Sequence, residues 1–192
     1  MKSTLVVLGS IFGVIAICVL WFISAGNSLI ELDEKVNSSW SQVENVYQRR
    51  ADLIPNLVNS VKGYAKHETE LLTAVTEARA SVGQIKVSAP GDLKKFDAAQ
   101  GQLSSALSRL MVVAEKYPDL KANQNFLELQ SQLEGTENRI TVERQRFNES
   151  AREFNTAIRQ FPKSMVADSK GFKAREYFEA KKGSENAPEV KF

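Results

Sequence analysis

Histidine and cysteine are nearly absent from this chain, which has one of each among its 192 residues. The one cysteine, Cys18, lies in an apolar segment, so the rest of the chain needs no disulfide and fits either redox compartment. The one histidine, His67, has no compact serine and acid set beside it for a catalytic triad. Metal sites in helical bundles need histidines and carboxylates from facing helices, and Glu68 and Glu70 alone do not supply them. We therefore expect no metal, no cofactor and no catalytic residue.

Other signatures of chemistry are missing too. The sequence has no glycine-rich phosphate loop and no zinc-ligand spacing. The net charge is only +2 and acidic and basic residues alternate, so no basic stripe indicates nucleic-acid binding. No small-molecule substrate is evident. These absences favour a structural or interaction protein over an enzyme.

Residues 5–23 form a long uncharged apolar run. As a helix the run spans about 28 Å, close to the hydrocarbon core of a bilayer. A cleaved signal peptide has a shorter apolar region, and Cys18 follows Ile17 rather than the small residue that a lipoprotein needs. We expect an uncleaved single-pass anchor in the inner membrane. Basic residues near it, such as Lys2 and Lys35, bias orientation only slightly, towards an N-terminus inside and the bulk of the chain outside the cytoplasm.

An apolar seam at helical spacing follows the anchor and predicts a long helix over 29–78. Pro55 interrupts it without changing its phase, which favours a continuous helix, kinked near residues 51–54, over two helices joined by a turn. The seam consists of Leu29, Leu32, Val36, Trp40, Val43, Tyr47, Arg50, Ile54, Leu57, Val61, Tyr64, Glu68, Leu71, Val75 and Ala78.

The rest of the chain predicts two more long helices. After a boundary at 81–92, apolar residues recur at three and four over 93–117, and again over 126–161 after a short connector. The expected fold is all-α: an N-terminal transmembrane helix, then an antiparallel up-down bundle of three long helices, with a short fourth helix as an option. The expected domains are the anchor at 1–27, the bundle at 28–162, and a tail at 163–192 whose aromatics dock on the bundle.

Four parts of the sequence form a distinctive set: Trp40, the run RRADLIPNLVNSVKGYAKHE at 49–68, the run TENRITVERQRFNESAREFNTAIRQFP at 136–162, and GFKAREYFEAKKGSENAPEVKF at 171–192. Together they resemble the bacterial LemA family. The resemblance implies a membrane-anchored helical bundle without an established enzymatic activity. A related magnetosome protein is implicated in shaping or organising a membrane compartment, which extends to this chain by analogy only.

Arg50 is the charged residue in the middle of the seam, where an unpaired charge would be costly. It should meet a carboxylate, such as Asp52, Glu143 or Glu149, or extend its charge to solvent. The pair then either stabilises the kink or docks a partner. The residues chosen for a structural or partner-docking role are Trp40, Tyr47, Arg49, Arg50, Asp52 and Pro55.

Helix lengths suggest that part of the seam lacks a partner within the chain. The second helix, about 37 Å long, returns from the distal loop only to the level of Pro55. Residues 28–50 would then associate with copies of the chain or with another membrane protein. Alternatively, Pro55 marks a true turn and 28–50 folds back as a fourth helix. The expected function is a membrane-anchored scaffold or assembly protein at the cell envelope; a regulatory subunit of a membrane protease, transporter or signalling protein is the alternative, and an enzyme the third.

Overall fold

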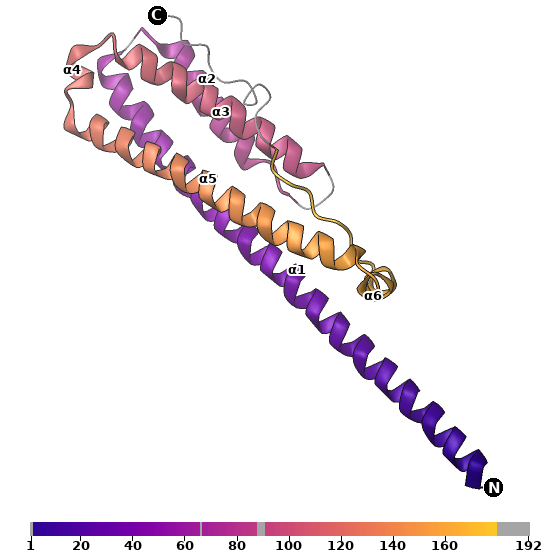
Figure 1. The fold of residues 1–192 in the computed structure, drawn as a ribbon. Helices are drawn as coiled ribbons and strands as arrows, with labels where there is room; N and C mark the ends of the chain where they lie inside the picture. The colour runs from indigo at the N-terminus through magenta and orange to yellow at the C-terminus, as the bar shows by residue number, and fades with distance from the viewer. Residues whose placement is uncertain (1, 66, 88–90, 180–192) are drawn as a thin grey trace, which may run out of the picture. The chain divides into compact units, whose positions relative to one another are not determined.

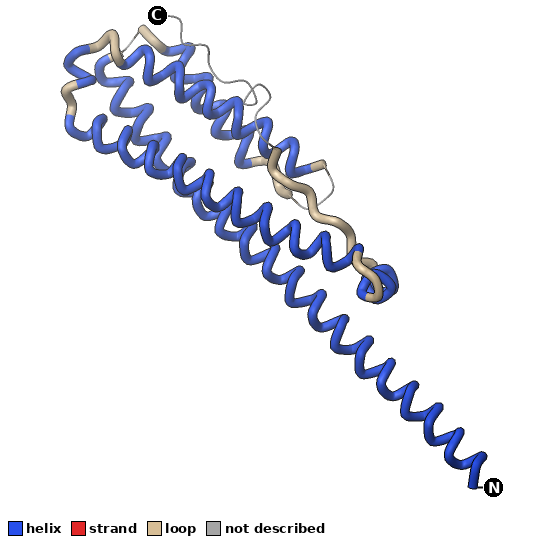
Figure 2. The backbone as a smooth tube through the Cα atoms, in the orientation of Figure 1, coloured by secondary structure: helices blue, strands red, loops and turns tan. Residues whose placement is uncertain are grey.

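The computed structural model describes residues 2–65, 67–87 and 91–179 (Figures 1 and 2). The fold is all-α, as predicted, and no strand occurs within these ranges. Val190 and Phe192 of the predicted tail lie outside them. The helices are α1 (Lys2–Tyr64), α2 (Thr69–Gly83), α3 (Asp92–Ala114), α4 (Pro118–Lys121), α5 (Gln124–Arg159) and α6 (Lys163–Lys170).

The chain divides into two compact units, and α1 and α5 contribute to both. The first unit combines residues 1–42 with 145–175, and the second combines residues 43–144 with 176–192. The apolar segment at residues 5–23 and α6 therefore belong to the first unit, whereas α2, α3 and α4 belong to the second.

Helix α1 continues through Pro55, as the unbroken phase of the seam predicts, but it ends at Tyr64. The prediction that it reaches Ala78 is wrong. Beyond Val61 the next buried residue is Ala65, and Tyr64 is 43% exposed. The chain leaves the helix here, and the following apolar residues form the separate helix α2, which packs on α3. The apolar residues of α2 continue the spacing of the seam, although they belong to a separate helix.

A side chain from α2 replaces the hydrogen bond that Pro55 cannot donate within α1. Pro55 has no N–H to donate to the carbonyl oxygen of Ala51, four residues earlier. Nε of Arg79 donates a hydrogen bond to that oxygen instead, at 2.8 Å. The helix therefore passes the proline without leaving a carbonyl unpaired at this position.

The second unit has a continuous apolar core to which all five of its helical segments contribute. Asn123 begins α5, because its Oδ1 accepts a hydrogen bond from the N–H of Phe126 as an N-cap does. Nδ2 of the same side chain donates to the hydroxyl of Tyr64 at the end of α1, at 3.0 Å. Buried members of the core include Ile54, Leu57, Val61, Ala65, Leu72, Val75, Leu103, Leu107, Leu110, Ala114, Leu120, Phe126 and Leu133.

In the first unit, the C-terminal part of α5 lies beside α1 (Figure 1). Nζ of Lys35 contacts a carboxylate oxygen of Glu153 at 2.6 Å, and the hydroxyls of Ser39 and Ser150 are 2.9 Å apart. Within residues 28–50, the buried apolar residues of α1 are Leu29 and Val36 in this unit and Val43 and Tyr47 in the second, each at most 5% exposed.

The prediction that residues 28–50 lack a partner within the chain is therefore wrong. The comparison of lengths considered only the helix that returns after the first loop, which is the 23-residue α3. It left out α5, which has 36 residues and spans about 54 Å. In each unit, a different part of α5 packs beside α1.

Arg79→Ala should lower the free energy of unfolding by about 1–2 kcal/mol, because it leaves the Ala51 carbonyl without a donor. In a Pro55→Ala background the loss should shrink to less than about 0.5 kcal/mol, since the new N–H at position 55 can bond to that carbonyl. Urea unfolding followed by circular dichroism of the full chain in detergent measures both.

Arg109→Ala is the matched control, because Arg109 is an exposed arginine on α3. Equal losses for Arg79→Ala in the two backgrounds would show that Arg79 does not act through the proline.

Candidate functional site

The six residues singled out in the sequence do not form one site. Arg49, Asp52 and Pro55 are exposed, and Asp52 accepts a hydrogen bond from Nε2 of Gln48, one turn earlier. Trp40 belongs to the first unit, where its ring meets that of Phe147 edge-on, with 5.5 Å between centroids. The remaining two, Tyr47 and Arg50, point into the second unit and lie in a polar network.

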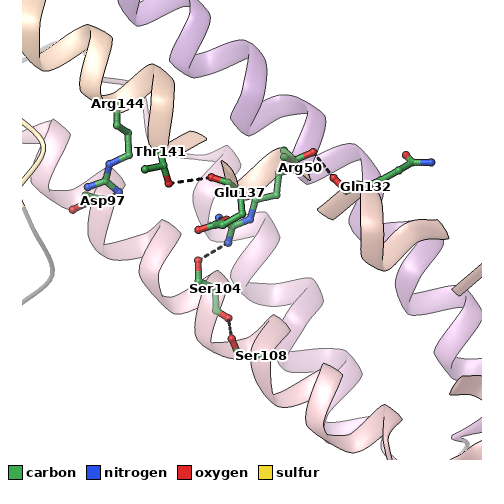
Figure 3. A network of polar contacts seen from close by, with 9 residues as sticks. Arg50, Asp97, Ser104, Ser108, Gln132, Glu137, Thr141 and Arg144 are labelled. Carbon is green, nitrogen blue, oxygen red and sulfur yellow. Dashed lines mark hydrogen bonds and ion pairs between the residues drawn. The ribbon is translucent and has the colours of Figure 1, made fainter. Parts of the chain in front are cut away.

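Arg50 is the centre of that network (Figure 3). The residue is only 3% exposed, because its position on the buried face of α1 turns the side chain towards α3 and α5. Its guanidinium donates to the hydroxyl of Ser104 on α3 at 2.7 Å and to a carboxylate oxygen of Glu137 on α5 at 3.0 Å.

The expectation of a carboxylate partner for Arg50 is met by a residue that was not proposed. Its partner is Glu137, so the suggestions of Asp52, Glu143 and Glu149 are wrong. The side chain of Glu137 is 52% exposed, whereas that of Arg50 is 4% exposed. Burial lowers the pKa of Arg50 below its ordinary value, and the charge of Glu137 opposes this effect.

A second ion pair lies next to the first. Arg144 on α5 reaches Asp97 on α3 at 2.8 Å, and its guanidinium lies 4.3 Å from the centre of the Phe178 ring. Tyr47 packs edge-on against Phe96, with centroids 5.0 Å apart. Burial raises the pKa of Tyr47, while the positive charge of Arg144 lowers it.

The sequence held a signal for this second pair that was not used. Glu137 and Arg144 are seven residues apart on α5, so they lie on the same face two turns from one another. Because Glu137 pairs with Arg50 of the seam, Arg144 seven residues later is expected to face the neighbouring helices as well. Which acidic residue it meets depends on how α3 and α5 align.

Sequence reasoning also missed a clamp in the first unit, centred on Arg175. The side-chain amide of Asn155 on α5 donates to the carbonyl oxygen of Arg175 at 2.8 Å and accepts from its N–H at 2.7 Å. The guanidinium of Arg175 donates to Oδ1 of Asp33 at 2.8 Å and to Oδ1 of Asn37 at 3.1 Å, both on α1. These four hydrogen bonds hold the segment after α6 against both long helices of the unit.

The side chains in the network of Arg50 are of the kinds that stabilise helix packing. Within the residues that the structure describes, no group of three or more histidine, cysteine, aspartate or glutamate side chains is placed to hold a metal ion. His67 is exposed at the turn between α1 and α2. An open groove of about 440 Å³ in the second unit is mainly polar, with Asn56, Asn59, Ser60, Asn125, Glu128, Leu129 and Gln132 as its lining. Its amides and single carboxylate offer hydrogen bonds and no nucleophile paired with a base.

A family model described as "LemA family" matches residues 39–192. The chain belongs to the LemA family. It is 27% identical over 176 residues to magnetosome protein MamQ of Magnetospirillum gryphiswaldense, a match that covers 81% of this chain and 65% of MamQ. It is also 27% identical over 161 residues to Protein LemA of Metamycoplasma hominis, covering 82% of this chain and 71% of that protein.

The part of the chain that matches the LemA family begins at Ser39. The network of Arg50 lies entirely inside it. The apolar segment at residues 5–23 and Asp33, which contributes to the clamp of Arg175, lie before it. The chain spans about two thirds of the length of the MamQ relatives, at 65%.

Glu137→Gln should lower the free energy of unfolding by about 1–2 kcal/mol, because a buried guanidinium then lacks its carboxylate; the exposure of Glu137 makes this less than for a fully buried pair. Arg50→Met should change it by less than about 1 kcal/mol, because methionine fills the space and leaves Glu137 to solvent. Urea unfolding of the full chain compares the two.

Arg49→Met is the matched control, since Arg49 is the exposed neighbour of Arg50. In the Arg50→Met background, Glu137→Gln should have no measurable effect. A cost there as large as in the unmodified chain would mean that Glu137 acts through another residue.

Stability should fall when the pH rises above about 10, the ordinary pKa of tyrosine. The folded-state pKa of Tyr47 is raised, so its contribution is complete below the unfolded pKa and is lost as the pH rises through the folded pKa. Tyr47→Phe should make the free energy of unfolding less dependent on pH in this range. Unfolding curves at a series of alkaline pH values test this.

Tyr117 also has a raised pKa, chiefly from desolvation, with its hydroxyl donating to Glu68. Tyr117→Phe is therefore the companion variant, and some of the pH dependence should remain in each single variant. A pH dependence unchanged by Tyr47→Phe would contradict the role given to burial.

Proposed function

We propose that this chain is a single-pass membrane-anchored helical scaffold or assembly protein of the bacterial cell envelope, without catalytic chemistry. One observation carries the proposal. Helix α1 is long and apolar enough to cross a membrane, and every described large apolar side chain from Val7 to Ile23 is at least 40% exposed. An apolar surface of this size is stable in lipid and unfavourable in water.

The arrangement of the helices after the anchor supports the scaffold. In the second unit, Arg50 meets Glu137 and Tyr64 meets Asn123. In the first, Lys35 meets Glu153 and Ser39 meets Ser150. In both units, residue numbers rise along α1 as they fall along α5, which supports the antiparallel up-down bundle. Such a bundle is a rigid element that presents helix surfaces to partners.

The comparisons and the chemistry support the same proposal. Relatives of this chain carry the name of the magnetosome, which favours a role in organising a bacterial structure. The network of Arg50 holds three helices together and lacks a paired nucleophile and base. We propose the lipid bilayer, and copies of the chain or another membrane protein, as partners, and neither nucleic acid nor a small-molecule substrate.

A regulatory role towards a membrane protease, transporter or signalling protein is the second candidate. The polar groove lined by Asn56, Asn59 and Asn125 favours it, because side-chain amides can bond to the backbone of a docked segment. In either case we propose the N-terminus inside the cytoplasm and the bundle outside. A C-terminal alkaline phosphatase fusion that is inactive in cells would contradict this orientation.

Native mass spectrometry of the full chain, extracted in a mild detergent at natural expression levels, should show a homo-oligomer. A stoichiometric foreign subunit would support the regulatory role instead. A monomer without a partner would count against both.

Cross-linking in intact membranes before extraction is the control for complexes lost in detergent. Val36 and Val43 are unsuitable cross-linking positions, because both are buried within the chain. Exposed positions such as Ser41 serve instead.

A further inference from the structure

The end of α5 and the start of α6 expose an apolar surface next to the anchor. Phe161 is 81% exposed, which is the largest value among the exposed large apolar residues in the described part of the chain, and Met165 is 62% exposed. We call Phe161 and Met165, with the basic residues around them, the α6 surface. On the opposite side of α6, Val166 and Ala167 are buried, so the helix is fixed to the unit and presents Met165 outwards.

Two contacts place α6 at one level of α1. Nζ of Lys163 donates to the hydroxyl of Ser28 at 3.0 Å. The side chain of Lys170 lies so close to Gly26 that a Cβ atom at position 26 would be 2.8 Å from Cε of Lys170. Figure 1 shows α6 beside α1 at this level.

At this level of α1, the exposed apolar segment ends and the buried part of the helix begins. Ile23 is 53% exposed, whereas Ala25 and Leu29 are buried. Gly26 and Ser28 come three and five residues after Ile23, which is about 4–8 Å along the helix. If residues 5–23 fill the hydrocarbon core, α6 lies at the depth of the lipid headgroups.

The composition of the α6 surface fits that depth. Between residues 159 and 173, the basic residues are Arg159, Lys163, Lys170 and Lys173, and the one acidic residue is Asp168. The segment is thus more basic than the chain as a whole, whose net charge is +2. Aromatic and aliphatic side chains among lysines and arginines are typical of elements that lie in the membrane interface and attract anionic lipids.

We propose that the α6 surface rests in the interface of the bilayer, with Phe161 and Met165 among the acyl-chain ends and the exposed basic side chains of Arg159, Lys170 and Lys173 at anionic lipid headgroups. The proposal rests on the membrane anchor proposed above. It adds a second contact with lipid, which holds the first unit at a defined depth and limits its rotation about the anchor.

Fluorescence quenching in vesicles tests this with the full chain. Phe161→Cys and Met165→Cys, in a Cys18→Ser background, each receive a bimane label and are reconstituted into phosphatidylcholine, with or without phosphatidylglycerol. Ser41→Cys is the matched control, because Ser41 is exposed in the same unit, about 20 Å along α1 from Ser28. The native Cys18, labelled in the unmodified chain, reports on the anchor.

Lipids with a shallow nitroxide should quench the labels at 161 and 165 several-fold more than the label at 41. Aqueous iodide should show the reverse order, and phosphatidylglycerol should enlarge the differences. A label on Cys18 should be quenched only by a deep nitroxide.

The contrary outcomes are distinct. If the labels at 161 and 165 behave like the label at 41 while Cys18 stays in lipid, the α6 proposal fails and the anchor stands. If iodide reaches Cys18, the anchor fails, and the α6 proposal with it. Labels shielded from both quenchers would show a protein contact, such as a second copy, in place of lipid. Equal results in the two vesicle types would overturn the assignment of anionic headgroups.

Discussion

Burial of one face of α1 is the constraint on which the other elements depend. Buried residues recur along this helix from Leu29 to Val61, and α5 lies beside it in both units. No single short helix can cover a face of that length, so the chain covers it in parts: α5, α6 and the segment around Arg175 in the first unit, and α2, α3, α4 and α5 in the second. The order and lengths of the later helices follow from this requirement.

Two polar groups on α1, the carbonyl of Ala51 and the guanidinium of Arg50 on that apolar face, bond to groups on other helices. The carbonyl of Ala51, left without its usual donor by Pro55, accepts from Arg79 of α2. The guanidinium of Arg50 bonds to Ser104 of α3 and to Glu137 of α5. The bonds of Arg50 avoid the cost of an unpaired buried charge, and each of the three hydrogen bonds fixes the alignment of two helices. The polar network therefore specifies the packing, which is a structural task consistent with a scaffold.

The helix that is long and apolar enough to cross a membrane is also the helix around which the first unit packs. Exposure changes to burial between Ile23 and Ala25, so no flexible linker separates the apolar segment from the packed part of α1. The clamp of Arg175 on Asp33 and Asn37 secures the chain a little farther along the same helix. With the membrane anchor proposed above, this continuity would keep the first unit close to the bilayer surface, where contact between α6 and lipid is favourable.

The sequence by itself determined the all-α class, the apolar segment near the N-terminus, the continuation of helix through Pro55 and the position of Arg50 on the seam, because each follows from local spacing or composition. Only the tertiary structure decided which carboxylate pairs with Arg50, that Arg79 donates to the carbonyl of Ala51, and that Asn155 bonds to Arg175. These contacts depend on the alignment of helices far apart in the chain. It also decided the end of α1 at Tyr64. A face that is continuous in sequence can still be divided between two helices when α3 offers the second half a better partner, since packing outweighs helix propensity.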